Sequence, residues 1–185
     1  NYLAFNFALT YAGDEGLGGG IAYSGKSAVV AILTGNHLYN NDGSLIAAGG
    51  KGGGFYLSGL VTPSLVSGNV FTRNFGTHSN DGDGGGIYVA DSVVTLAENT
   101  FVDNAATWSG SYGRGGGICV DGGEVVVTRN VITANFGGGF PGFPSTARGL
   151  GGGIAAIGGQ TVIRHNTVIN NGGTNADNWG MGGGI

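Results

Sequence analysis

A glycine-rich phrase that returns six times constrains the fold of this chain more than any other feature. The phrase is Gly-x-Gly-Gly-Gly followed by Ile or Phe. Its copies lie at Gly16–Ile21, Gly50–Phe55, Gly82–Ile87, Gly113–Ile118, Gly149–Ile154 and Gly180–Ile185. The intervals between successive glycine triplets are 34, 32, 31, 36 and 31 residues. A unit that returns at this period is typical of stacked supersecondary elements, so the sequence predicts a solenoid.

A second phrase, two Asn residues separated by four others, runs in step with the first. The pairs are Asn1/Asn6, Asn36/Asn41, Asn69/Asn74, Asn99/Asn104, Asn130/Asn135 and Asn166/Asn171. An apolar residue, such as Leu38 or Phe71, stands two positions after the first Asn of each pair. After each glycine triplet the apolar residues alternate with period two, as in Ile87-Tyr88-Val89, which is the pattern of a β-strand.

These patterns predict an all-β chain that forms a right-handed, single-stranded parallel β-helix of about five to six coils. We expect three short strands in each coil and one variable loop between the second Asn and the next glycine phrase. The first Asn is expected to mark a sharp corner, because Asn tolerates left-handed backbone angles. Residues 1–185 are predicted to be one β-helix segment. Since both ends interrupt a repeat, we expect it to be part of a longer chain.

Equivalent residues of stacked coils lie above one another and form columns. The Ile or Phe after each triplet is predicted to form one core column, and the apolar residue after each first Asn another. The Asn residues are predicted to form amide ladders that join successive coils. The ladder residues are Asn36, Asn41, Asn69, Asn74, Asn99, Asn104, Asn130, Asn135, Asn166 and Asn171.

Composition limits the partners of the chain. Charged residues make up 10% of the 185 residues, and the seven Lys and Arg are scattered along a chain of net charge −4. A nucleic-acid partner is not expected, because it requires clustered cations. No apolar run approaches the roughly twenty residues of a transmembrane helix, so no span is expected in this segment. Cys119 is the only cysteine, so no disulfide can form within the chain.

Two motifs suggest ligands, but neither is complete. The glycine phrase lacks the last Gly of a dinucleotide-binding loop, because Ile or Phe stands at that position in all six copies. Asn80–Gly84 resembles the start of a calcium loop, although the Glu and the flanking helices of an EF-hand are missing. A solvated loop is the favoured interpretation there and at Asp14-Glu15. We therefore expect no metal site and no cofactor.

No catalytic residue is predicted. Polysaccharide cleavage on a β-helix requires a cluster of carboxylates. Asp91, Asp121 and Glu124 lie in or beside one turn region but do not recur at one position on adjacent coils. The three His residues stand at unrelated repeat positions, so no Ser-His-Asp arrangement is implied.

Aromatic residues in the variable segments are the candidates for binding. Exposed aromatic side chains among small polar residues can stack on sugars or anchor a protein partner. The alternative is that they fold over the glycine-rich face and stack on aromatic residues of adjacent coils, and this alternative is favoured. The candidates are Trp108, Tyr112, Phe140, Phe143 and Trp179.

The Gly-Gly-Gly-Ile phrase and the Phe-x-x-Asn phrase at Phe71–Asn74 and Phe101–Asn104 resemble a known family. They are similar to the Gly-Gly-Ala-Ile and Phe-x-x-Asn repeats of bacterial polymorphic outer-membrane proteins. They are equally similar to the wider pectate-lyase-like set of right-handed β-helix surface proteins. The resemblance covers the whole chain and implies the β-helix fold. Proteins of this set include adhesins, autotransporter passengers, phage tailspikes and polysaccharide-cleaving enzymes.

The leading hypothesis is a non-enzymatic scaffold or adhesin segment that is extracellular or on the cell surface, with the bacterial outer surface favoured. Surface glycans or other protein subunits are its expected partners. One alternative is a carbohydrate-binding or polysaccharide-cleaving β-helix protein. Another is a subunit of a filament or surface layer, since open coil ends are strand edges that need a cap or a partner.

Overall fold

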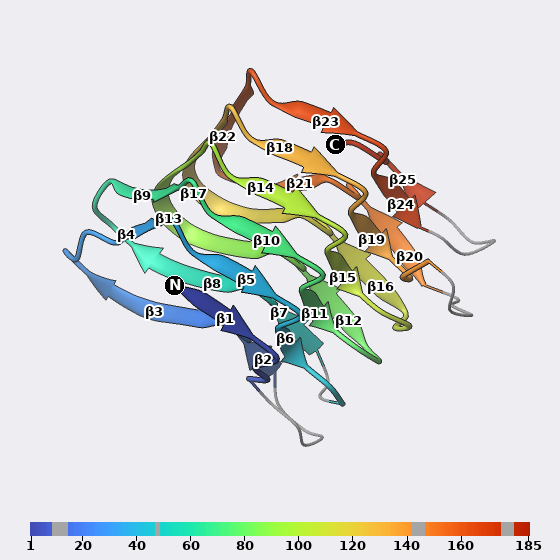
Figure 1. Ribbon diagram of the computed structural model, residues 1–185. Helices are drawn as coiled ribbons and strands as arrows, with labels where there is room; N and C mark the ends of the chain where they lie inside the picture. The colour runs from blue at the N-terminus through green and yellow to red at the C-terminus, as the bar shows by residue number, and fades with distance from the viewer. Residues whose placement is uncertain (9–14, 47–48, 142–146, 175–179) are drawn as a thin grey trace.

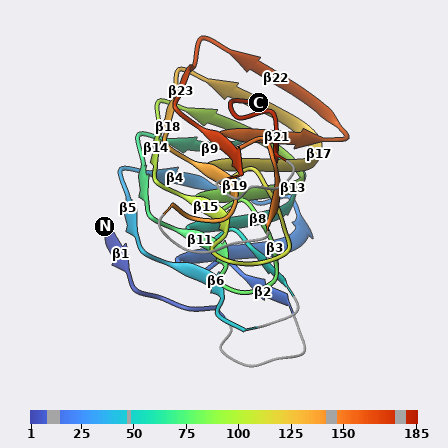
Figure 2. The same cartoon turned by 90° about the vertical axis from the view of Figure 1, so that its right-hand side faces the viewer.

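The computed structural model is a right-handed parallel β-solenoid of about five turns. It describes residues 1–8, 15–46, 49–141, 147–174 and 180–185, and within these ranges the regular elements are all β-strands. Figures 1 and 2 show the coils stacked in chain order, with the two chain ends at opposite ends of the stack. Every strand pairing is parallel and joins one coil to the next. The predicted fold class is confirmed.

Sheet A carries the residues between the two Asn of each pair. Its six strands follow one another in chain order across the stack. They are β1 (Tyr2–Ala4), β5 (His37–Tyr39), β10 (Val70–Thr72), β14 (Thr100–Val102), β18 (Val131–Thr133) and β23 (Thr167–Ile169). The middle residue of each strand points into the core, and Phe71 and Phe101 stack there with ring centroids 4.6 Å apart. This is the predicted apolar column.

Sheet D follows the glycine phrases and bends around the other side of the core. Its strands are β3 (Ile21–Ser27), β4 (Ile32–Thr34), β8 (Phe55–Leu60), β9 (Ser64–Ser67), β13 (Ile87–Ala97), β17 (Ile118–Thr128), β21 (Ile154–Ile157) and β22 (Gln160–Arg164). Asp121-Gly122-Gly123 forms a bend within the continuous strand β17, where both glycines have positive φ. The core lies between the two halves of sheet D and sheet A.

The column after the glycine triplets is confirmed over five coils. Ile21, Phe55, Ile87, Ile118 and Ile154 are paired in register, and the last four are fully buried. Ile185 is different, because 61% of its surface is exposed. Each fully buried large aliphatic or aromatic side chain contributes roughly 1.5–3 kcal/mol to folding, so this column is a major source of stability.

The two Asn ladders are continuous. In both, the side-chain Nδ2 of one Asn donates to Oδ1 of the Asn on the next coil, as from Asn74 to Asn104 at 3.0 Å. The backbone N–H of Asn74 donates to the same oxygen at 2.9 Å. Nδ2 of Asn104 also donates to the backbone oxygen of Phe71 at 2.9 Å. The ladder therefore satisfies backbone groups at the corners as well as side-chain amides.

The corners are formed differently from the prediction. The left-handed residue is the one before each ladder Asn, not the Asn itself, and its φ lies between 52° and 63° at positions such as Gly35, Asn40 and Ala134. The ladder Asn instead fixes the corner through its side-chain hydrogen bonds. Only the repeated spacing of the Asn was visible in the sequence, because the residues before them share no type.

Ala134→Gly is expected to stabilise the protein by about 1 kcal/mol, because a residue with a Cβ is strained in the left-handed region. Ala134 has φ of 54° and is half-buried. Ala156→Gly in β21 is the matched control, since Ala156 is exposed and its φ is not positive. Urea unfolding of both variants should show a higher midpoint for Ala134→Gly only. A lower midpoint for Ala134→Gly would contradict the assignment.

Two further sheets correct the expectation of three strands and one loop in each coil. Sheet B follows the second Asn and contains β6 (Asp42–Ser44), β11 (Phe75–Thr77), β15 (Ala105–Thr107), β19 (Phe136–Gly138) and β24 (Gly172–Thr174). Sheet C precedes the glycine triplet and contains β2 (Glu15–Leu17), β7 (Gly49–Lys51), β12 (Asp81–Asp83), β16 (Tyr112–Arg114), β20 (Arg148–Leu150) and β25 (Gly180–Met181). The connection between these two strands varies most in length from coil to coil.

Sheets B and C pack face to face through glycine. A Cβ on the first glycine of the phrase would lie 1.9 Å from Ala106 O at Gly82 and 1.8 Å from Gly137 O at Gly113. These distances are far below any real contact, so the two backbones touch directly. The residues at this interface have almost no side chains, and they therefore lack the apolar alternation that reveals a strand in a sequence.

The triplet glycines are required for separate reasons. The first has φ between 55° and 65°, as at Gly84, where a Cβ would also meet the backbone of Ile87. A Cβ on the second, such as Gly85, would lie 2.3 Å from Ala105 O in sheet B. A Cβ on the third, such as Gly86, would lie 2.5 Å from the backbone of the next coil. The phrase is therefore a steric requirement of the coil.

Candidate functional site

The variable position of the glycine phrase forms an outward column on sheet C. The central residue of each sheet C strand packs on sheet B, so the residues on either side of it face away from that interface. The column pairs in register from coil to coil. It consists of Leu17, Lys51, Asp83, Arg114, Leu150 and Met181.

The charged part of this column is paired across the coils. Arg114 donates from Nε to Asp83 Oδ1 at 2.7 Å and from Nη2 to Oδ2 at 2.5 Å, a bidentate pair. Lys51 Nζ lies 2.8 Å from Glu15 Oε2. The hydrogen bonds to Asp83 raise the pKa of Arg114 further above its usual range, so the guanidinium stays charged.

A groove with both signs of charge runs along this face, and we call it the polar groove. It spans the strands β2, β7, β12 and β16, and its floor includes the glycines of β7. Its side chains are Glu15, Lys51, Asp81, Asp83, Tyr112 and Arg114. Asp81 is exposed and Tyr112 is half-buried, so both are accessible from solution. Tyr112 also lines an adjoining apolar pocket with Arg148, Leu150 and Met181.

Sheet D contributes tyrosines next to the polar groove. Tyr88 stacks on Tyr56 with ring centroids 5.6 Å apart, and Lys51 Nζ lies 5.6 Å from the centroid of the Tyr88 ring. The Tyr88 hydroxyl donates to Asp121 Oδ2 at 2.8 Å. Burial and this hydrogen bond raise the pKa of Tyr88 well above its usual value, so the hydroxyl stays protonated. Burial likewise raises the pKa of the neighbouring Cys119 thiol, which is unreactive for that reason.

Sheet B and the residues that follow its strands carry an aromatic stack. Trp108 lies between His78 and Phe140, with centroid distances of 4.9 Å and 5.2 Å and nearly parallel planes. Phe75 packs beneath Trp108 at 4.7 Å, and the Arg73 guanidinium lies 5.7 Å from the Phe140 centroid. Trp108 and Phe140 are half-buried, as the alternative interpretation of these residues expected. Their candidacy as binding residues stays a prediction.

The structure pairs His78 with Asp42, and no sequence pattern connects these two residues. Asp42 Oδ2 contacts Nδ1 of His78 on the next coil. Oδ1 of Asp42 accepts a hydrogen bond from the backbone N–H of Ser44 at 3.1 Å. Burial raises the pKa of Asp42, and the contact with His78 only partly opposes that effect. A carboxylate in this position therefore reduces stability at neutral pH.

Asp42→Asn is expected to raise the free energy of unfolding at pH 8 by the order of 1 kcal/mol and to change little at pH 4. The folded-state pKa of Asp42 lies above its ordinary value of 3.8. The protonated Asp42 carboxyl therefore makes its full contribution to stability below pH 3.8. This contribution is lost as the pH rises through the raised pKa of the folded state. Unfolding of both proteins between pH 4 and 8 tests this. A variant less stable than the parent at pH 8 would show that the contact with His78 outweighs the cost of burial.

The predicted candidates do not converge on one site. Tyr112 lines the polar groove, whereas Trp108 and Phe140 belong to the aromatic stack. Phe143 and Trp179 lie outside the described residues. Sequence reasoning missed the charged column. The signal that could have found it is the alternation of Lys51, Asp83 and Arg114 at the one variable position of the glycine phrase.

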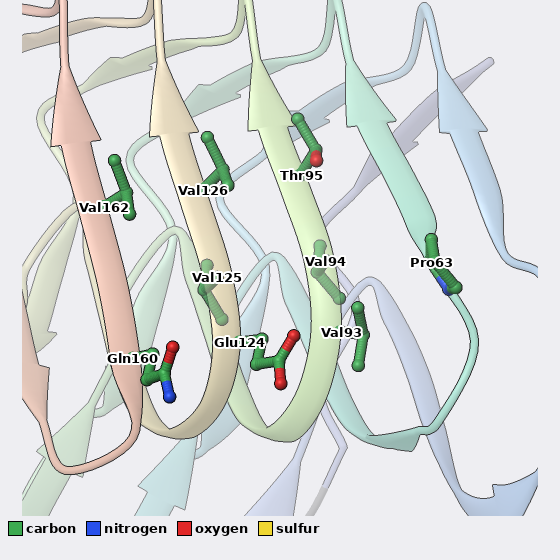
Figure 3. Close-up of a pocket in the computed structure, with 9 residues that line it drawn as sticks. All are labelled: Pro63, Val93, Val94, Thr95, Glu124, Val125, Val126, Gln160 and Val162. Atoms are coloured by element: carbon green, nitrogen blue, oxygen red, sulfur yellow. The ribbon is translucent and has the colours of Figure 1, made fainter.

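A shallow trough lies on the outer face of sheet D, and Figure 3 shows the side chains around it. It is lined mainly by valines such as Val93, Val126 and Val162, and Glu124 is its one charged side chain. It offers hydrophobic contact but few groups that could orient a ligand. The polar groove is therefore the better candidate site.

Within the described ranges, no three His, Cys, Asp or Glu side chains gather in a way that could hold a metal ion. In the same part of the chain, none of the elements is a helix long and apolar enough to cross a membrane. No family model, curated protein or solved structure matches the chain. The structure alone therefore defines the class of fold, the parallel β-solenoid.

Proposed function

We propose that this chain is a segment of a non-enzymatic scaffold or adhesin on an extracellular surface, and that it holds its ligand in the polar groove. The main support is the way the chain uses its ionisable side chains. Asp83 and Arg114, Glu15 and Lys51, and Glu98 and Arg129 each join two adjacent coils. These groups are engaged in holding the stack together, which leaves them poorly placed to transfer protons.

The second support is that variation is confined to the outer surface. The interior repeats the same residue types in each coil, while the outward positions of sheet C change from Lys51 to Asp83 to Arg114. A rigid, repeated frame with a changing surface suits recognition. The repeat phrases also resemble those of bacterial polymorphic outer-membrane proteins and of the wider pectate-lyase-like surface proteins. That resemblance supports a bacterial outer-surface location.

The proposal is tested by measuring whether the chain binds surface glycans or proteins without cleaving them. The purified chain is applied to arrays of cell-surface glycans and surface proteins, and the supernatant is assayed for new reducing ends. We expect retention on one or more probes and no release of product. Tyr112→Ala should weaken that binding by about tenfold, which corresponds to about 1.4 kcal/mol. Glu124→Ala is the matched control, because Glu124 is exposed on sheet D and lies outside the polar groove.

Release of reducing ends from a polysaccharide would overturn the non-enzymatic assignment and favour the carbohydrate-cleaving alternative. Equal losses of binding in the two variants, or none in either, would remove the polar groove as the binding surface.

A further inference from the structure

Two charged side chains of sheet C have no partner of opposite charge. Four of the charged residues on its described strands form the two cross-coil pairs of the polar groove. The other two are Asp81 in β12 and Arg148 in β20, and neither makes an ion pair within the described ranges. Both side chains are exposed. Sheet C therefore offers one carboxylate and one guanidinium to a ligand.

The two unpaired charges lie on opposite sides of Tyr112. Its strand, β16, pairs with β12 on one side and with β20 on the other, and the three strands follow one another in Figure 1. Tyr112 is aligned in register with Arg148, and Asp81 is likewise the first residue of its strand. Since successive coils are about 4.8 Å apart, the backbones of Asp81 and Arg148 are separated by about 10 Å. With Tyr112 between them, the two charges do not pair with each other.

Two hollows meet at Tyr112. The polar groove extends from Tyr112 to Asp81 and onward over the glycines of β7, which have no side chain to fill it. The apolar pocket extends from Tyr112 to Arg148 and is lined further by Leu150 and Met181. A ligand that follows the stack can therefore contact a carboxylate, an apolar surface and a guanidinium in that order.

This order of groups selects a class of ligand. A neutral sugar would use neither charge, and an acidic glycan would be repelled by Asp81. A protein segment supplies a basic, an apolar and an acidic side chain within a few residues. Alternate residues of an extended segment lie on the same face, and three of them span about 13 Å. The long Arg148 side chain can cover the difference between this span and the separation of the two charges.

We propose that the polar groove and the adjoining apolar pocket bind an extended peptide segment of a protein partner, in which three alternate residues are basic, apolar and acidic. The basic side chain pairs with Asp81, the apolar one packs on Tyr112 and Leu150, and the acidic one pairs with Arg148. Alternate side chains provide specificity when an extended segment is recognised. This inference rests on the proposed function and names the ligand of that site.

Fluorescence anisotropy of short labelled peptides, with both ends blocked, tests the proposal on the whole 185-residue chain. The first probe has the sequence Lys-Ser-Leu-Ser-Glu. Two further probes replace either its Lys or its Glu with Gln. We expect the first probe to bind about fivefold more tightly than either of the others, which is the upper end of the effect of losing one exposed ion pair.

Variants of the protein assign each charge of the probe to its partner. Asp81→Asn should weaken binding of the first probe about fivefold and leave binding of the probe without Lys unchanged, because that pair is already broken. Arg148→Gln should behave in the same way toward the probe without Glu. Glu124→Gln on sheet D is the control and should bind all three probes as the parent does. Thermal unfolding of each variant verifies that the fold is retained.

Equal binding of the three probes by the parent protein, or binding of none, would overturn the proposal. It would also be overturned if Asp81→Asn still distinguished the probe with Lys from the probe without it. Retention of a glycan on the arrays, together with no peptide binding, would overturn the peptide assignment and leave the proposed adhesin function standing. No retention of any glycan or protein on the arrays would overturn the proposed function, whatever the peptides show.

Discussion

Gly113→Ala is expected to destabilise the protein by at least about 3 kcal/mol, the upper end of the cost of overpacking. The added Cβ would lie 1.8 Å from Gly137 O on the facing strand. Both atoms that clash are attached to backbone in paired sheets, so neither can move away as a flexible side chain would. Relief requires that sheets B and C separate. Chemical unfolding of the purified variant measures the loss directly.

Gly25→Ala is the matched control for this prediction. Gly25 lies in β3, and a Cβ there would meet only the end of the Tyr23 side chain, with the hydroxyl oxygen nearest at 3.7 Å. Its φ is not positive, so Ala is compatible with the backbone. We expect a change within about 0.5 kcal/mol, as for an ordinary surface substitution. Similar losses in the two variants would show that the glycine contact between sheets B and C is not what limits stability.

Asn104→Ala is expected to cost about 3 kcal/mol or more. Asn104 is fully buried, and its Oδ1 accepts hydrogen bonds from both the backbone N–H and the Nδ2 of Asn74. Its removal leaves two buried donors without that acceptor, at a cost of about 1–3 kcal/mol each. It also removes the Nδ2 donor to Phe71 O and Asn135 Oδ1. A urea midpoint shift at unchanged slope would measure the effect.

Asn1→Ala is the comparison, because Asn1 is exposed and its side chain joins the ladder through one hydrogen bond, from Nδ2 to Asn36 Oδ1. We expect it to cost about 1 kcal/mol or less. If the two substitutions had equal effects, the ladder would contribute no more inside the stack than at its end, and buried donors without an acceptor would not account for the loss of stability.

The sequence was most informative where a coil repeats a side chain. The Ile or Phe after the triplet and the two Asn of each pair recur in step, and the structure stacks them in the expected columns and ladders. Stacking selects for identical residues, because each coil faces a copy of the same environment above and below. A repeat of that kind is visible without any structure.

Structural features that do not repeat a side chain leave no pattern in the sequence. Sheets B and C can pack closely because glycines such as Gly82 and Gly113 have no side chain at the interface. Their strands therefore carry no apolar pattern. The left-handed corners accept residues as different as Arg129, Ala134 and Gly68, so they leave no signature either. Cross-coil partners such as Asp42 and His78 occur once and have no repeat to reveal them.

The glycine phrase and the Asn pairs thus determined by themselves that the chain winds into a parallel β-helix and which residues fill its core. Only the tertiary structure decided which surfaces the coil presents. The position of an outward side chain depends on how sheet C packs on sheet B and on the pairing register of neighbouring coils. These contacts join residues about 30 positions apart, as Asp83 and Arg114 are. The polar groove exists only once the coils are stacked.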